Sequence, residues 1–121
     1  MKRSLSQSIA NAIHGLSGLL REERNIRIHI FATGTALASG VYLGFSAIEL
    51  SIVCLTCSVV IAGELFNAAL ERYSDIVKPR VSQYVEQVKD ISAASVLVLA
   101  CMALLVGLLL YTPKIITRFF Y

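Results

Sequence analysis

The sequence predicts an all-α membrane protein with three transmembrane helices plus an N-terminal amphipathic helix in the membrane interface. Hydrophobic residues make up 56% of the 121 residues and charged residues only 16%, whereas soluble domains carry roughly 25% charged residues. Three long apolar segments, 28–46, 50–70 and 91–111, follow an N-terminal region of mixed polarity, 4–22. We expect the whole chain, residues 1–121, to form a single domain.

Residues 4–22 have the pattern of an amphipathic helix. Leu5, Ile9 and Ile13 recur at helical spacing, and polar residues such as Gln7 and His14 fill the opposite face. Beside three apolar segments, this pattern favours a helix lying in the membrane interface over one packed on a soluble partner. Because polar residues interrupt the run, we do not interpret it as a signal peptide.

The first two apolar segments are predicted to form a tight helical hairpin. Residues 28–46 are apolar apart from His29, and a stretch of 19 residues is long enough to cross a bilayer. A connection of only a few residues leads to the second segment, 50–70. Gly40 and Gly44 form one G-x-x-x-G, which permits close helix packing but is weak evidence as a single instance.

The third apolar segment, 91–111, contains no charged residue, and we expect it to end at Pro113 and Lys114. The basic residues predict its orientation. Nine lie before the first segment or in the second connection and two in the C-terminal tail: Lys2, Arg3, Arg21, Arg24, Arg27, Arg72, Lys78, Arg80 and Lys89, against Lys114 and Arg118. The N-terminus and the second connection are therefore expected in the cytoplasm.

The second segment carries the clearest sign of chemistry. Glu64, Asn67, Glu71 and Asp75 fall within about 80° of a helix surface at about 100° per residue. A charge inside the bilayer costs roughly 2.5–3.5 kcal/mol, so such a row indicates a cation-binding or acid/base site near the cytoplasmic boundary. The alternative is that these side chains only join helices by hydrogen bonds.

Two more polar clusters are predicted at the same depth. Glu23 and Arg27 precede the first segment, and Lys89 and Asp90 precede the third. Taken alone, these are typical of a surface ion pair and of a helix start. Taken together with the acidic row, they offer carboxylates for Mg²⁺ and basic groups for phosphates.

Other function classes find no support in the sequence. It has neither a P-loop nor a protein-kinase signature set, and its basic residues form no stripe typical of nucleic-acid binding. Cys54 and Cys57 lie inside an apolar run, where cysteine serves as a small hydrophobic residue.

The chain resembles the prokaryotic diacylglycerol kinase family, which includes the undecaprenol kinases. The resemblance rests on residues 64–71 (ELFNAALE) with Asp75, on Lys89-Asp90, and on residues 23–29 (ERNIRIH). It extends from about Ala12 to Lys114. One departure is Arg80-Val81-Ser82, where many members carry an acidic-aromatic-His triplet.

The resemblance implies a homotrimer in the inner (plasma) membrane, with active sites between subunits at the cytoplasmic surface. The implied reaction transfers the γ-phosphoryl group of MgATP to a lipid hydroxyl. Glu64 would be the general base, and Glu23 and Glu71 would hold Mg²⁺. The residues implied to orient the nucleotide and its phosphates are Asn67, Asp75, Lys89, Asp90 and Arg27.

The run at 23–29 and the Pro113-Lys114-Ile115 end are similar to the undecaprenol kinase branch. Undecaprenol is therefore the expected substrate, with diacylglycerol as the alternative. From other classes, a small cation transporter using Glu64 and an inactive membrane adaptor remain as alternatives.

Overall fold

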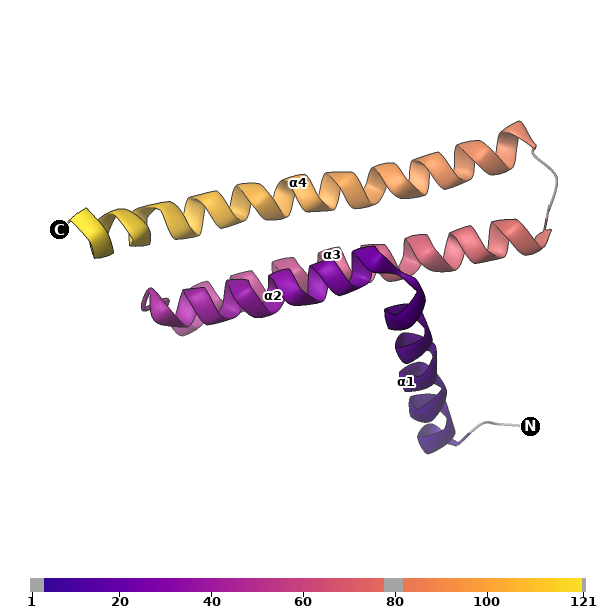
Figure 1. Cartoon of the computed structure of the whole chain (residues 1–121), viewed down its shortest axis with the longest axis horizontal. Coiled ribbons are helices and arrows are strands. Elements are labelled where there is room, and N and C mark those ends of the chain that lie inside the picture. The colour runs from indigo at the N-terminus through magenta and orange to yellow at the C-terminus, as the bar shows by residue number, and fades with distance from the viewer. Residues whose placement is uncertain (1–3, 78–81, 121) are drawn as a thin grey trace.

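The computed structural model describes residues 4–77 and 82–120, and all regular secondary structure in this part of the chain is helical. The helices are α1 (Leu5–Glu22), α2 (Arg24–Tyr42), α3 (Ala47–Val77) and α4 (Gln83–Phe120). Helices α2, α3 and α4 run along one another as an elongated bundle, and α1 projects from the side of it (Figure 1). The all-α prediction is confirmed for the described residues.

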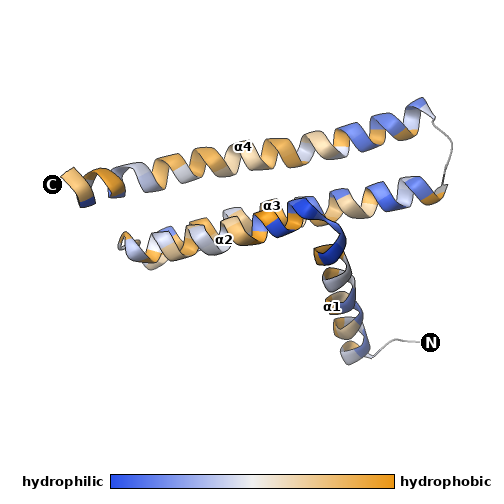
Figure 2. Cartoon of the chain, in the orientation of Figure 1, coloured by the Kyte–Doolittle hydropathy of each residue, from blue (hydrophilic) through white to orange (hydrophobic). Residues whose placement is uncertain are grey.

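Within the described residues, α3 and α4 are the helices long and apolar enough to cross a membrane. Figure 2 shows their apolar middle parts and their hydrophilic ends near the α3–α4 connection. Helix α2 falls outside this group because two arginines, one histidine and several small polar residues lower its hydropathy. The membrane segment predicted at 28–46 therefore stays a prediction.

The turn between α2 and α3 differs from the predicted one. Helix α2 ends at Tyr42 rather than at Ser46. Gly44 adopts a φ of 73°, a left-handed conformation that suits glycine, and the Phe45 amide donates to the Gly40 carbonyl over 3.0 Å. Gly44 thus makes the turn, and only Gly40 of the G-x-x-x-G pair packs inside a helix.

Ser46 and Glu49 form the start of α3. The Ser46 amide donates to Glu49 Oε2 over 2.7 Å, and the Glu49 amide donates to Ser46 Oγ over 3.2 Å. This reciprocal pair is a capping box, which satisfies free amide groups at a helix start. It explains why α3 begins earlier than the apolar segment that starts at residue 50.

Helix α4 continues through Pro113 to Phe120, so the prediction that it ends at Pro113 and Lys114 is wrong. Proline removes one backbone hydrogen bond, a loss that membrane helices tolerate when side chains and neighbouring helices compensate. Thr117 Oγ1 donates to the Pro113 carbonyl over 2.9 Å, and Lys114 pairs with Glu49 of α3 at 3.1 Å. These contacts support the helix beyond the proline.

Helix α3 contacts both α2 and α4. The buried apolar side chains are few and mostly small: Ile26, Phe45, Val53, Val60, Ala68 and Val96. At Gly63 the α3 backbone approaches α4 so closely that a Cβ would lie 2.5 Å from Leu99 Cδ1. Most large apolar side chains remain exposed, as expected for helices surrounded by lipid or by other copies of the chain.

Helix α1 has the amphipathic character predicted for residues 4–22. It begins with a capping box between Ser4 and Gln7. It contacts α2, yet none of its residues is buried, and Leu5, Ile9 and Ile13 are all more than half exposed. A helix with such an uncovered apolar stripe suits the membrane interface.

Candidate active site

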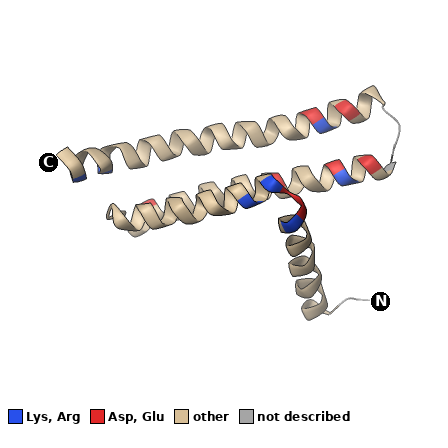
Figure 3. Cartoon of the chain, in the orientation of Figure 1, with Lys and Arg blue, Asp and Glu red and all other residues tan. Residues whose placement is uncertain are grey.

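Charged residues gather toward one end of the bundle (Figure 3). They come from the end of α1, the start of α2, the second half of α3 and the start of α4. The predicted site residues at this end are Glu23, Arg27, Glu64, Asn67, Glu71, Asp75, Lys89 and Asp90. A long stretch of α3 and α4 without charged residues separates this end from Glu49, Lys114 and Arg118 at the other.

Glu64 is a buried carboxylate paired with a histidine that the sequence analysis did not assign to the site. The residue is 7% exposed, and its Oε1 lies 3.1 Å from Nε2 of His29 on α2. A buried carboxylate is costly unless it is hydrogen-bonded. The signal that could have identified His29 was its place as the one strongly polar residue of segment 28–46, near the expected depth of Glu64.

Asn67 and Glu71 follow Glu64 on the same face of α3. Asn67 Nδ2 donates to Glu71 Oε1 over 3.3 Å. Asn67 Oδ1 is buried and has no hydrogen-bond partner among the described residues. Since nearly all buried polar atoms are satisfied, this oxygen leaves an acceptor position open for a donor or a cation.

Arg72 connects Glu23 to this part of α3. Its Nη2 lies 2.5 Å from Glu22 Oε2 and 4.0 Å from Glu23 Oε1. Glu23 is the extended residue between α1 and α2. The Arg72 contact therefore holds the α1–α2 junction against the helix that carries Glu71.

The predicted metal ligands do not form a complete cage on their own. No group of three or more His, Cys, Asp or Glu residues within 4–77 and 82–120 could hold a metal ion. Mg²⁺ used with nucleotides commonly takes only one or two carboxylates, and the substrate phosphates supply further oxygens. Glu23 and Glu71 are carboxylates of the kind that such a donor set uses, and the open Asn67 oxygen belongs to the side chain that donates to Glu71.

Asp75 and Lys89 join α3 to α4. Lys89 Nζ donates to Asp75 Oδ1 over 2.8 Å. Lys89 precedes the apolar segment of α4, and its hydrogen bond to Asp75 raises the pKa of the amine above its ordinary value. Asp90 follows with an exposed side chain.

The structure places Arg27 in a contact of its own. Its Nη1 donates to the carbonyls of Arg21 over 3.2 Å and Leu20 over 3.5 Å. A cation at the free carbonyls of a helix end is stabilising, so this contact accounts for Arg27 structurally. The role of Arg27 toward a nucleotide stays a prediction. The departure from the family pattern at 80–82 also stays untested, because Arg80 and Val81 lie outside the described residues.

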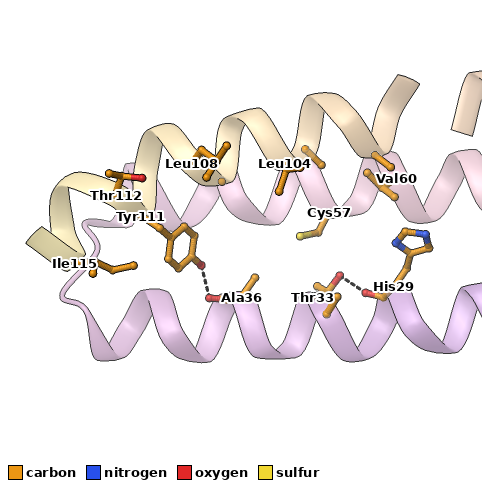
Figure 4. A pocket seen from close by; sticks show the side chains of 14 residues that line it. His29, Thr33, Ala36, Cys57, Val60, Leu104, Leu108, Tyr111, Thr112 and Ile115 are labelled. Carbon is orange, nitrogen blue, oxygen red and sulfur yellow. Dashed lines mark hydrogen bonds between the residues drawn. The ribbon is translucent and has the colours of Figure 1, made fainter. Parts of the chain in front are cut away.

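An apolar cavity of about 480 Å³ runs along the bundle next to this site. It lies between α2 and α4, with α3 behind it, and extends from His29 to Tyr111 and Ile115 (Figure 4). Small residues such as Ala103 and Gly107 leave the space open. Tyr111 reaches across the cavity, and its hydroxyl donates to the Ala36 carbonyl.

Comparison with known proteins places the chain in a family. The sequence profile described as "Prokaryotic diacylglycerol kinase" matches residues 10–111. "Undecaprenol kinase" of Bacillus subtilis (strain 168) is 30% identical over 109 residues, 90% of this chain and 89% of the relative. "Diacylglycerol kinase" of Synechocystis sp. (strain ATCC 27184 / PCC 6803 / Kazusa) is 31% identical over 115 residues, 94% of this chain and 66% of the relative. The chain therefore belongs to the prokaryotic diacylglycerol kinase family.

Proposed function

We propose that this protein is an ATP-dependent lipid kinase that transfers the γ-phosphoryl group of MgATP to the hydroxyl of a membrane lipid, undecaprenol in the first place. Family membership supports the reaction class. The single structural observation that carries the proposal is Glu64, a buried carboxylate at the end of the uncharged stretch 50–63 of α3. A base at this position can meet a lipid hydroxyl from the membrane side while ATP stays in water.

The chemical step needs one proton acceptor. As the lipid oxygen forms its bond to the γ-phosphorus, its proton passes to Glu64. The bond between the γ-phosphorus and the oxygen bridging to the β-phosphate breaks, and ADP leaves. A base contributes to such a step when it lies within hydrogen-bond reach of the proton.

The remaining predicted residues provide positioning and charge. Phosphoryl transfer depends mainly on the positioning of the reactants and on the neutralisation of charge. Glu23 and Glu71 would hold Mg²⁺, which neutralises charge on the phosphate oxygens. Asn67 offers its open oxygen beside Glu71. Lys89 would contact phosphate, held in place by Asp75, while Asp90 and Arg27 border the nucleotide.

Two observations support undecaprenol over diacylglycerol. At 30% and 31% identity, the match covers 89% of the Bacillus undecaprenol kinase and 66% of the Synechocystis diacylglycerol kinase, so this chain resembles the undecaprenol kinase more in its length. The first-segment entrance at 23–29 is also similar to the undecaprenol kinase branch. The cavity beside His29 suits the apolar tail of either lipid, because its lining is mostly apolar.

The proposed arrangement in the cell follows from the charges. With nine basic residues against two, the positive-inside rule puts the N-terminus and the charged end of the bundle in the cytoplasm. Helix α2 would supply the third membrane segment in the plasma (inner) membrane. The many exposed large apolar side chains leave surface for lipid and for the subunit contacts of a homotrimer.

A small cation transporter is the candidate function from another class, and the structure gives little support for it. A transport path needs polar groups through the membrane depth. Between Glu49 and Glu64 the hydroxyls of Ser51, Thr56 and Ser58 all donate to carbonyls of their own helix. These hydroxyls are therefore already used, which favours the kinase. The hypothesis of an inactive membrane adaptor can be excluded only by measuring kinase activity.

The test measures phosphate transfer from ATP by purified protein in mixed micelles, with undecaprenol and diacylglycerol offered side by side. Glu64→Gln keeps a hydrogen-bonding side chain toward His29 but removes the base. We expect kcat to fall roughly 10²–10⁴-fold, the usual contribution of a general base. Glu49→Gln, at the far end of the same helix, is the matched control and should retain activity.

A phosphorylated lipid that disappears only in Glu64→Gln supports the proposal, and the better substrate decides between the two lipids. If folded protein phosphorylates neither lipid, the kinase proposal is wrong, and the transporter and adaptor hypotheses become the leading ones.

A further inference from the structure

We propose that His29 is a positioning residue for the reaction, which holds the Glu64 carboxylate by one oxygen and leaves the other free for the lipid hydroxyl. This inference rests on the proposed role of Glu64 as the base. It assigns a function to a histidine that the sequence analysis did not place in the site.

The hydrogen bonding of Glu64 is one-sided. Its side chain is 9% exposed, and within the described residues His29 is its hydrogen-bond partner, through Oε1. Oε2 receives no hydrogen bond from those residues, and it is not among the fully buried unsatisfied atoms. Because a carboxylate accepts at both oxygens, His29 determines which oxygen is left for a substrate.

Both side chains project from well-packed parts of their helices. His29 lies three residues after Ile26, which is 1% exposed. Glu64 lies one turn after Val60 and one turn before Ala68, each 5% exposed. The 3.1 Å contact therefore joins two positions whose backbones have little freedom to move, as preorganised catalytic groups require.

The imidazole also borders the apolar cavity. His29 lies at one end of the cavity near Val60 in Figure 4, whereas Glu64 is not among the lining residues. His29 thus contacts the proposed base on one side and the proposed place of the lipid tail on the other. A substitution of His29 therefore changes the place where the lipid hydroxyl would meet the Glu64 carboxylate.

The competing interpretation is that His29 only satisfies a buried carboxylate and joins α2 to α3. A purely structural contact would alter folding or substrate affinity. A positioning contact would lower kcat while the KM values for lipid and ATP stay near the wild-type values, because ground-state binding is retained.

The experiment compares His29→Leu, which cannot donate, with His29→Gln, whose amide can still donate toward Glu64. We expect His29→Leu to lower kcat on the order of tenfold to a hundredfold, by analogy with the loss of partners that orient metal ligands. His29→Gln should restore most of kcat. His14→Leu changes the other histidine, exposed on α1, and should have no effect.

A double-mutant cycle tests whether His29 acts through Glu64. If it does, Glu64→Gln combined with His29→Leu is no slower than Glu64→Gln alone, because without the carboxylate there is no base for His29 to position. If His29→Leu does not fold, His29→Asn takes its place, since its shorter amide does not reach Glu64.

Three outcomes would overturn the proposal. These are wild-type kcat in His29→Leu, a change confined to KM, and a full additional loss in the double variant. Failure of the proposed function looks different, because Glu64→Gln would then be as active as the wild type. If Glu64→Gln is inactive while His29→Leu is fully active, only the proposed role of His29 is wrong.

Discussion

Lys89 of α4 donates a hydrogen bond to Asp75 of α3 across 2.8 Å, at the end of the bundle where charged residues gather. A second pair with the same chemistry, Lys114 and Glu49 at 3.1 Å, joins the same two helices near their other ends. The two lysines are therefore matched in helix, partner type and geometry. They differ in that Lys89 is proposed to contact phosphate, whereas Lys114 is not.

This relationship predicts opposite results for the two lysines. Lys89→Ala should raise the KM for ATP by about tenfold or more, as expected for losing a hydrogen bond to a charged group. Asp75 raises the pKa of Lys89, so the ammonium stays charged at neutral and mildly alkaline pH and the effect should persist there. Steady-state kinetics at several ATP concentrations measure it. Lys114→Ala should leave the KM for ATP unchanged, and equal effects at both positions would contradict a specific phosphate contact.

Glu22 and Glu23 offer a test of the metal assignment. Both contact Arg72, but only Glu23 is proposed to hold Mg²⁺. Glu23→Gln should raise the Mg²⁺ concentration needed for half-maximal activity by about tenfold or more, since even partners of metal ligands cost 10–100-fold. Glu22→Gln breaks an exposed ion pair, which contributes little, and should leave the Mg²⁺ dependence as it was. A shift in both variants would point to the α1–α2 junction rather than to a metal ligand.

Gly107 tests whether the lipid tail occupies the cavity. Among the described residues, no atom outside the neighbouring helix backbone lies within 4 Å of the position where its Cβ would be, so the side chain of Gly107→Leu starts in open space and should fill part of the cavity. The KM for a long-chain lipid should rise by about tenfold or more, since a methylene in an apolar pocket is worth about 1–3 kcal/mol. Phosphorylation of a short-chain alcohol analogue should be unaffected.

Gly34 is the matched control for that variant. It also has open space around its Cβ position, and it does not line the cavity. Both substitutions favour the helix over glycine, so a stability difference does not confound the comparison. Equal KM values for the long-chain lipid in Gly107→Leu and Gly34→Leu would exclude the cavity as the place of the tail.

Tyr111 predicts a modest effect on stability. Tyr111→Phe removes the hydrogen bond to the Ala36 carbonyl but keeps the ring beside Phe45, at a centroid distance of 4.6 Å. Hydrogen bonds between membrane helices average about 0.6 kcal/mol and reach about 1.7 kcal/mol, and we expect a loss in this range. Denaturant unfolding in micelles measures it, with the exposed Tyr84→Phe as the control. A loss of several kcal/mol would show that Tyr111 does more than bridge two helices.

The sequence by itself determined the all-helical fold, the apolar segments in α3 and α4, and the polar face of Glu64, Asn67, Glu71 and Asp75. These features are local, because hydrophobic length and the helical period are properties of consecutive residues. The family motifs are equally local, which is why the resemblance at 64–71 and 23–29 pointed to the family that the comparison then confirmed.

Only the tertiary structure decided how the helices meet. The partnership of His29 with Glu64 joins residues 35 positions apart, and it depends on how far each helix is rotated about its axis and shifted along it. Neither quantity is encoded in the periodicity of one helix. The same reason explains the Arg27 contact with α1 and the continuation of α4 past Pro113, where contacts to other residues offset a local preference.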